Sequence, residues 1–418
     1  RVKGKSVSNH MTEENKSGFE KIGRAAALYP QEKQSKRDKK AKSLSIGVPL
    51  EMGKQENRIS LKPESVEVLV QNGHQVNVEA SAGNSANYAD TDYSEVGAQI
   101  VYDRKTVYAS DVILKVEPPT IEEIGLIPSG ATLISALQPA SQSIEYLKAL
   151  QEKKIIGLAF EFIEDKVGGL PIVRSMSEIA GSSVMLIAAE LLSKTNSGSG
   201  VILGGVTGVP PTKAVIIGAG TVAEYATRAA LGLGVDLQVF DNRVYKLRRL
   251  KHAVGWQVHT STFDHPSLGK ALESADVLIG AMRAENGVNG MVVSEEMIAN
   301  MKPNSLVIDV SIDQGGCIET SRLTTLDTPT FRKYDVVHYC VPNIASRVPR
   351  TASIAISNIL TPILIQMGEA GGIEEMILRN QWFMKGVYAY KGSISNQHLA
   401  TKYNLIFKDL RLLMAARF

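Results

Sequence analysis

The sequence predicts an α/β protein with two doubly wound domains, each a parallel sheet flanked by helices. Short apolar runs of strand length alternate with helical stretches in two series, one on either side of the glycine-rich segment 196–213. Such alternation indicates a parallel sheet, because parallel neighbours need a crossover connection. The length of 418 residues also favours two domains with separate cores over one.

The first series predicts a domain of residues 44–174. Its apolar runs are separated by helical stretches such as 63–73 and 141–154. Strands are expected at 44–50, 74–80, 98–103, 111–117, 131–137 and 155–162.

The second series predicts a domain of residues 175–350. A long amphipathic helix at 176–194, which starts after Pro171, is suited to bridging the two domains. Strands are expected at 214–220, 236–242, 275–282, 305–313 and 335–342.

A second long apolar helix is expected at 351–368, followed by a polar, helix-rich tail. A chain that leaves the second domain by such a helix can return to the first, so residues 351–418 are expected to complete the domain of residues 44–174. The most apolar stretches are shorter or more interrupted than the roughly 18 residues of a membrane span. We interpret them as buried helices and expect no membrane partner.

The basic charge is confined to an N-terminal extension, residues 1–43. The formal net charge is +3, but residues 1–42 hold 12 Lys or Arg against 5 Asp or Glu, which leaves −4 on the rest. Without a repeated motif, such a segment is typical of a solvated, partly helical extension rather than a nucleic-acid arm. The only cysteines, Cys317 and Cys340, form no CxxC pattern. This argues against a disulfide framework or a structural zinc site and favours a reducing cytoplasm.

A glycine motif indicates what the second domain binds. Residues 218–223 read GAGTVA, in which Gly218 permits a tight turn and Gly220 lets the backbone approach a pyrophosphate. Asp241 ends the next predicted strand, where an acid would bind the adenosine ribose hydroxyls. The motif predicts a Rossmann-like dinucleotide-binding domain and favours NAD over NADP. The basic residues that follow leave NADP open as the alternative: Arg243, Lys246, Arg248 and Arg249.

Six segments together resemble the alanine dehydrogenase family, which is related to the soluble NAD-binding subunit of proton-translocating transhydrogenase. They are ENRISLKPESVEVLVQNGH, ILKVEPP, RSMSEIAG, LGGVTGVPPTKAVIIGAGTVAEYA, IDVSIDQGGCIETS and HYCVPNIASRVPRTAS. The resemblance covers nearly all of residues 44–400. It implies a substrate domain built from both chain ends, an inserted dinucleotide domain and a homo-oligomer, specifically a hexamer.

The resemblance also implies roles for single residues. Arg58 would hold the substrate carboxylate, and Lys115 would contact the same group or the keto oxygen. A 2-oxo acid needs a fixed cation and a polarising donor, although singly an Arg is usually a surface charge and a strand-end Lys usually extends to solvent. Asp313 resembles the family's carboxylate near the nicotinamide, which is a proton acceptor or a group that places water and ammonia, with a helix N-cap as the alternative. Asn343 resembles a contact for the nicotinamide and the substrate.

Further cofactor contacts implied by the resemblance are Ser177, Val222 and Lys246. Gln138 departs from the family, since many alanine dehydrogenases have a histidine in this segment. Glutamine can hydrogen-bond a carbonyl but cannot exchange a proton at pH 7. His338 lies in another predicted strand and is expected to be a buried structural residue.

These observations predict a cytoplasmic, NAD-dependent L-alanine dehydrogenase without a metal site. Lys115, Asp313 and Gln138 are the expected catalytic residues. One alternative is the soluble component of a proton-translocating NAD(P) transhydrogenase, for which Gln138 leaves room. The other is a catalytically silent NAD-binding protein.

Overall fold

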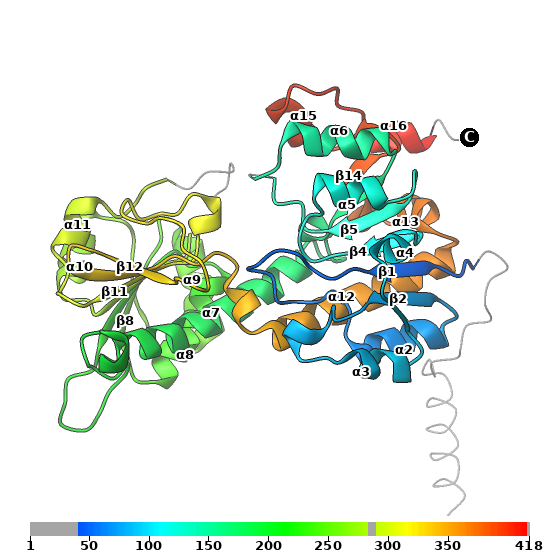
Figure 1. The fold of residues 1–418 in the computed structure, drawn as a ribbon. Helices are drawn as coiled ribbons and strands as arrows, with labels where there is room; N and C mark the ends of the chain where they lie inside the picture. Colours follow the sequence, from blue (N-terminus) through cyan, green and yellow to red (C-terminus); the bar gives the residue numbers. More distant parts are fainter. Residues whose placement is uncertain (1–40, 140, 283–289, 416–418) are drawn as a thin grey trace, which may run out of the picture. The chain divides into compact units, whose positions relative to one another are not determined.

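The computed structural model describes residues 41–139, 141–282 and 290–415. Most of the basic extension therefore lies outside the described residues. The described chain contains two mostly parallel sheets flanked by helices (Figure 1). The predicted fold class is confirmed.

The first sheet has the strand order β15-β14-β6-β5-β4-β1-β2-β3. Its strands β1 to β6 pair in parallel, whereas β14 and β15 are antiparallel. The strands are β1 (Ser45–Val48), β2 (Gln75–Glu79), β3 (Gln99–Val101), β4 (Val112–Leu114), β5 (Thr132–Ser135), β6 (Ile156–Ala159), β14 (Val387–Tyr390) and β15 (Ser393–Ile394).

The C-terminal tail is not only helical, because β14 and β15 form a hairpin that extends the first sheet. Lys391 and Gly392 connect the two strands, and both have positive φ, at +45° and +86°. Two central residues with positive φ are typical of the type I′ turn, whose backbone twist matches the twist of the two flanking strands. The helix-rich interpretation missed this turn.

The second sheet has the order β12-β13-β11-β10-β7-β8-β9, and all pairs except β12–β13 are parallel. The first strand in sequence, β7, lies between β8 and β10, so the chain order reverses there. Open α/β sheets bind ligands at such a point. The strands are β7 (Lys213–Ile217), β8 (Asp236–Phe240), β9 (His259–Ser261), β10 (Val277–Gly280), β11 (Leu306–Asp309), β12 (Thr330–Lys333) and β13 (Val336–Tyr339).

The helices cover these sheets and bring the long apolar segments into their cores. In chain order they are α2 (Pro63–Gln71), α3 (Asp90–Glu95), α4 (Arg104–Tyr108), α5 (Ile121–Leu126), α6 (Ile144–Glu152), α7 (Pro171–Leu192), α8 (Thr221–Gly232), α9 (Val244–Val254), α10 (His265–Glu273), α11 (Glu295–Ala299), α12 (Pro349–Ala370), α13 (Ile373–Arg379), α14 (Gln381–Met384), α15 (Gln397–Lys402) and α16 (Leu410–Ala415). Short 3₁₀ turns are η1 (Asn84–Ala86), η2 (Phe160–Phe162), η3 (Lys194–Asn196), η4 (Ile312–Gln314) and η5 (Ile344–Arg347).

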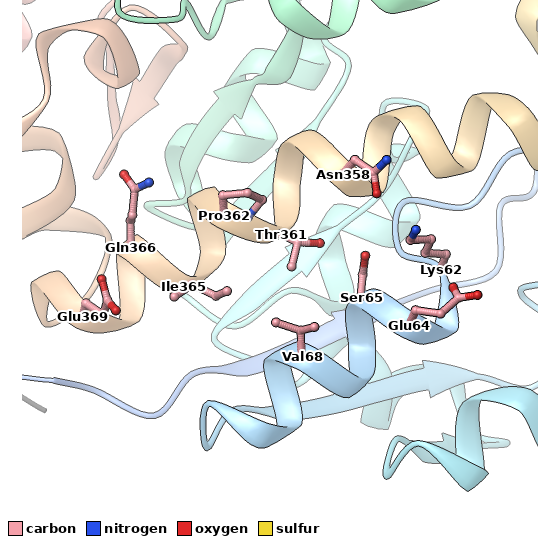
Figure 2. Close-up of a pocket in the computed structure, with 10 residues that line it drawn as sticks. All are labelled: Lys62, Glu64, Ser65, Val68, Asn358, Thr361, Pro362, Ile365, Gln366 and Glu369. Carbon is pink, nitrogen blue, oxygen red and sulfur yellow. The ribbon is translucent and has the colours of Figure 1, made fainter. Parts of the chain in front are cut away.

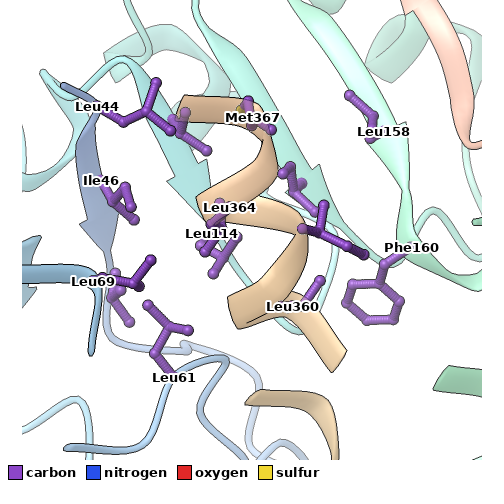
Figure 3. Packing of buried hydrophobic residues seen from close by; sticks show 14 of the residues in the cluster. Leu44, Ile46, Leu61, Leu69, Leu114, Leu158, Phe160, Leu360, Leu364 and Met367 are labelled. Carbon is purple, nitrogen blue, oxygen red and sulfur yellow. The ribbon is translucent and has the colours of Figure 1, made fainter. Parts of the chain in front are cut away.

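Among the described residues, α7 and α12 are long and apolar enough to cross a membrane by length and composition. Both instead contribute side chains to the cores. Leu360, Leu364 and Met367 of α12 lie in the cluster that covers the first sheet (Figure 3), and Val184 and Ala188 of α7 lie in the core of the second. Burial in the two cores therefore explains why these helices are so apolar.

Candidate functional site

The glycine turn after β7 needs glycine at its first position. Gly218 has φ +105°, and a Cβ there would lie 2.6 Å from the carbonyl oxygen of Ala281. Its N–H donates to the carbonyl oxygen of Phe240 at 2.7 Å. The turn therefore passes against the end of β10, where no larger residue fits.

The start of α8 fits the phosphates of a dinucleotide. A Cβ on Gly220 would meet no atom within 4 Å, so the backbone borders open space. No side chain caps the amides of the first turn of α8. These N–H groups, at the positive end of the helix dipole, are suited to binding an anion.

Asp241 is fixed at the same place by the backbone. One carboxylate oxygen accepts the N–H of Ala219 at 2.7 Å, and the other accepts the N–H of Arg243 at 2.8 Å. Each oxygen keeps a second lone pair, which can accept a ribose hydroxyl. Arg249 also reaches this turn, donating to the carbonyl oxygen of Ala219 at 3.0 Å, while Lys246 lies half-buried in the first turn of α9.

Helix α7 is packed closely against the cofactor helix α8. A Cβ on Gly181 would lie 2.4 Å from the carbonyl oxygen of Val222. Ser177 lies one turn earlier on α7, so it is on the same side of the helix as Gly181. The structure thus places Val222 at the contact between the two helices, and Ser177 one turn of α7 away from that contact.

Asp313 and Asn343 follow neighbouring strands of the second sheet. Asp313 lies in η4 after β11 and is exposed. Desolvation by the surrounding chain, with a smaller contribution from the negative charge of Asp309, raises the pKa of its carboxyl above the usual range. Asn343 follows β13 with φ +57°. Because β11 and β13 are parallel neighbours, both residues leave the sheet at the same edge.

Arg58 is held by one carboxylate in the loop after β1. Its Nε donates to Oε1 of Glu56 at 2.6 Å and its Nη2 to Oε2 at 2.5 Å, while Nη1 contacts the sulfur of Met176 at 3.4 Å. These bonds use three of the five N–H donors of the guanidinium. Arg58 is 9% exposed, so little water reaches its guanidinium.

Lys115 follows β4, the parallel neighbour of β1, and is more deeply buried, at 1% exposure. Its Nζ lies 3.0 Å from Oε2 of Glu51 and 3.4 Å from Oε1 of Glu123. Burial alone would lower the pKa of Lys115, but these two carboxylates outweigh it and raise the pKa. Burial raises the pKa of Glu51 to about 7 in spite of Lys115.

Gln138 follows β5, which is the parallel neighbour of β4, so it leaves the sheet on the same side as Lys115. Its φ is +49°. Its N–H donates to Oε1 of the half-buried Glu161 at 3.0 Å, whereas its own side chain is exposed. The backbone of Gln138 is therefore held by Glu161, and its exposed side-chain amide can reach a ligand.

One network connects the segment after β1 with the segment after β13. Nδ2 of Asn343 donates to Oε2 of Glu56 at 3.0 Å, and the N–H of Asn57 donates to Oγ of Ser346 at 2.9 Å. The structure thus brings together two predicted site residues, Arg58 and Asn343, through Glu56. The described contacts do not join Asp313 or Gln138 to this network.

Sequence reasoning missed the acidic members of the site. Glu51, Glu56, Glu117 and Glu123 surround the two predicted cations. A signal was present, because a Lys placed in a buried strand end requires a partner charge, and acids lie both in the loop before Arg58 and just after Lys115.

His338 is fully buried, as predicted. It bonds Oγ1 of Thr320 at 2.8 Å and stacks on Phe331, and burial lowers its pKa to about 4. Cys317 and Cys340 are free, buried thiols. Within the described ranges, no group of three or more His, Cys, Asp or Glu is arranged to hold a metal ion.

A groove of about 560 Å³ lies between α2 and α12 (Figure 2). Its walls include Ser65 and Val68 of α2 and Thr361 and Ile365 of α12. None of the predicted site residues lines this groove. The strand ends described above, rather than this groove, carry the candidate site.

Comparisons with known proteins cover both sheets. The family model of the alanine dehydrogenase/PNT N-terminal domain matches residues 47–180, and that of the C-terminal domain matches residues 184–397. Alanine dehydrogenase 2 of Staphylococcus aureus (strain USA300) is 36% identical over 368 residues, which cover 88% of this chain and 98% of the relative.

Two solved structures are similar to this chain over most of its length. An L-alanine dehydrogenase aligns with a TM-score of 0.82 and 33% identity, over 86% of this chain and 99% of that chain. A transhydrogenase from Sinorhizobium meliloti aligns with a TM-score of 0.73 and 22% identity, over 84% and 99%, a likeness that shows the fold alone. With both family domains matched and a relative above 30% identity over most of its length, the chain belongs to the alanine dehydrogenase/PNT family of oxidoreductases.

Proposed function

We propose that the chain is an NAD-dependent L-alanine dehydrogenase, which interconverts L-alanine, NAD and water with pyruvate, ammonium and NADH. The names of its relatives support an alanine substrate. The observation that carries the proposal is the pair of buried cations, Arg58 and Lys115, which follow the adjacent parallel strands β1 and β4. A 2-oxo acid offers one carboxylate and one carbonyl, and two fixed cations match this pattern.

The proposed cofactor site is the turn after β7. Members of the family bind a nicotinamide nucleotide, and the open space at Gly220, the uncapped start of α8 and the fixed carboxylate of Asp241 fit NAD. When bound, NAD would supply the hydride acceptor. Ser177, Val222 and Lys246 are proposed further contacts.

The chain's own residues would orient and polarise the substrate. Arg58 presents its two remaining donors to the carboxylate, held in place by Glu56. The ammonium of Lys115, on its four-carbon stem, turns from Glu51 towards the carbonyl oxygen. Gln138 donates to the same oxygen, and Asp313 and Asn343 lie on the nicotinamide side. These roles are proposals.

We also propose that residues 44–174 and 351–418 form the substrate domain, that residues 175–350 bind NAD, and that the enzyme is a cytoplasmic homo-oligomer, a hexamer by family resemblance. The strands β14 and β15 support the discontinuous domain, because they extend the first sheet from the C-terminal side. Size-exclusion chromatography with light scattering tests the hexamer.

The deciding assay follows NADH oxidation with pyruvate and ammonium together and with each omitted. An alanine dehydrogenase requires both. Oxidation that proceeds with an NADP analogue and no pyruvate would indicate hydride transfer of the transhydrogenase type. Tight NADH binding with no oxidation in any mixture would indicate a silent binding protein.

A further inference from the structure

One carboxylate at the candidate site has no assigned task. Glu117 lies two residues after Lys115, just beyond β4, and is half-buried. Within the described chain it forms no hydrogen bond or ion pair, whereas Glu51, Glu56 and Glu123 each pair with a cation. A partly desolvated carboxylate without a partner needs a physical reason.

The loop after β1 encloses this carboxylate. A Cβ on Gly53 would lie 1.9 Å from Oε2 of Glu117, so the carboxyl group lies directly over the backbone of the loop that carries Glu56 and Arg58. A larger residue at position 53 would displace this carboxyl group from its present position. The sequence and the fold thus place Glu117 beside the cations and leave its oxygens available.

Charged groups face Glu117 from three segments. Glu56 and Arg58 belong to the loop after β1, Lys115 to the end of β4, and Glu123 to α5. Burial and the negative charge of Glu56 raise the pKa of Glu117, and the positive charges of Lys115 and Arg58 oppose this without cancelling it. The carboxyl therefore binds a proton more readily than a solvated glutamate.

The proposed reaction requires such a group. Alanine binds as an ammonium ion, and its nitrogen cannot form a double bond to carbon until one N–H proton has left. Gln138 cannot accept that proton. Arg58 and Lys115 are already protonated and cannot accept it either, so among the predicted site residues only Asp313, in η4 after β11, competes with Glu117 for this role.

We propose that Glu117 is the acid–base residue of the site and takes this proton from the substrate ammonium. The N–H bond breaks and an O–H bond forms on Glu117. The freed lone pair then forms the C=N bond as the Cα–H electron pair leaves as hydride to the oxidised nicotinamide. In the reverse direction the Glu117 O–H returns the proton to nitrogen. This assignment rests on the proposed function.

The test is the pH profile of kcat/KM for alanine with saturating NAD, measured for the full chain and its variants. In the wild type, activity falls on the acid side as Glu117 becomes protonated. Glu117→Gln should remove this limb and lower kcat by about 10²- to 10⁴-fold, the usual range for one acid–base group. Glu117→Asp should keep a limb with reduced kcat, which shows that a carboxylate is required.

Controls separate the possible outcomes. Glu122→Gln, at an exposed position of α5, should leave the profile unchanged, and circular dichroism compares the folding of all variants. A Glu117→Gln protein that keeps the acid limb and wild-type kcat overturns the assignment, as does loss of the limb in Asp313→Asn instead. A wild type that is inactive with alanine overturns the proposed function, and the assignment with it.

Discussion

The close packing of α7 on α8 predicts an unusual response to a glycine-to-alanine change. In the interior of a helix, alanine is normally better than glycine by about 0.5–1 kcal/mol. At Gly181 the added Cβ would lie 2.4 Å from the carbonyl oxygen of Val222, against an ordinary contact of 3.4 Å or more. The two helices must therefore move apart by roughly 1 Å, and overpacking of this kind costs about 1–3 kcal/mol. Gly181→Ala should be destabilising by about 1–2 kcal/mol.

Gly269 provides the matched control. It lies in α10, beside the same sheet, and a Cβ there would meet no atom within 4 Å. Gly269→Ala should therefore stabilise the protein by up to about 1 kcal/mol. In thermal melts, Gly181→Ala should lower Tm by about 1–2 °C, the shift expected for a chain of this length, and Gly269→Ala should raise it slightly. Calorimetric titration with NADH adds a second measurement, in which only Gly181→Ala should weaken binding. If both variants shift Tm in the same direction, the packing argument is wrong.

Three further predictions concern the charged residues. Asp241→Ser should lose or reverse the preference for NADH over NADPH, checked by kcat/KM with each cofactor; equal use of both by the wild type would show that the basic cluster of α9 dominates. Lys115→Met should cost about 10²-fold or more in turnover and Gln138→Ala less, and the same steady-state assay would contradict this if Gln138→Ala were the more damaging. Glu51 has a pKa raised from 4.5 to about 7 by burial, so the stability it contributes is present below pH 4.5 and lost as pH rises through about 7. Glu51→Gln should therefore flatten urea-unfolding stability between these pH values, and an unchanged pH slope would count against the raised pKa.

The alternation of apolar runs predicted the fold class, because both cores are built from continuous buried strands. The exceptions have physical causes. The three residues of β9 (HTS) are polar and β15 has only two residues, so neither gives a strand-length apolar run. β14 (VYAY) is apolar and buried, but it is short and lies among helices, and the helix-rich interpretation of the tail overlooked it. The segment 155–162 was predicted as one strand, but its last three residues form the 3₁₀ turn η2, which re-aims Glu161 towards the backbone of Gln138.

The site was predicted in part. Gly218, Gly220 and Asp241 carry a spacing that is readable along the chain, and their backbone contacts fit the predicted cofactor site. Glu56 and Glu117 each lie two residues from a predicted cation, but no known motif marks this spacing. Glu51 reaches Lys115 only because β1 pairs with β4. The bond between Asn343 and Glu56 joins residues 287 positions apart and has no local signature at all.

The placement of β14 beside β6 has a consequence for synthesis on the ribosome. The second sheet is formed from one continuous stretch of chain, whereas β6 has to wait for β14, about 230 residues later, before its outer edge is paired. At 5–20 residues per second this delay is on the order of 10–50 s. During that time β6 exposes unpaired backbone groups, which are a template for wrong strand pairing between nascent chains. Chaperone capture should therefore concentrate on intermediates that end before residue 387.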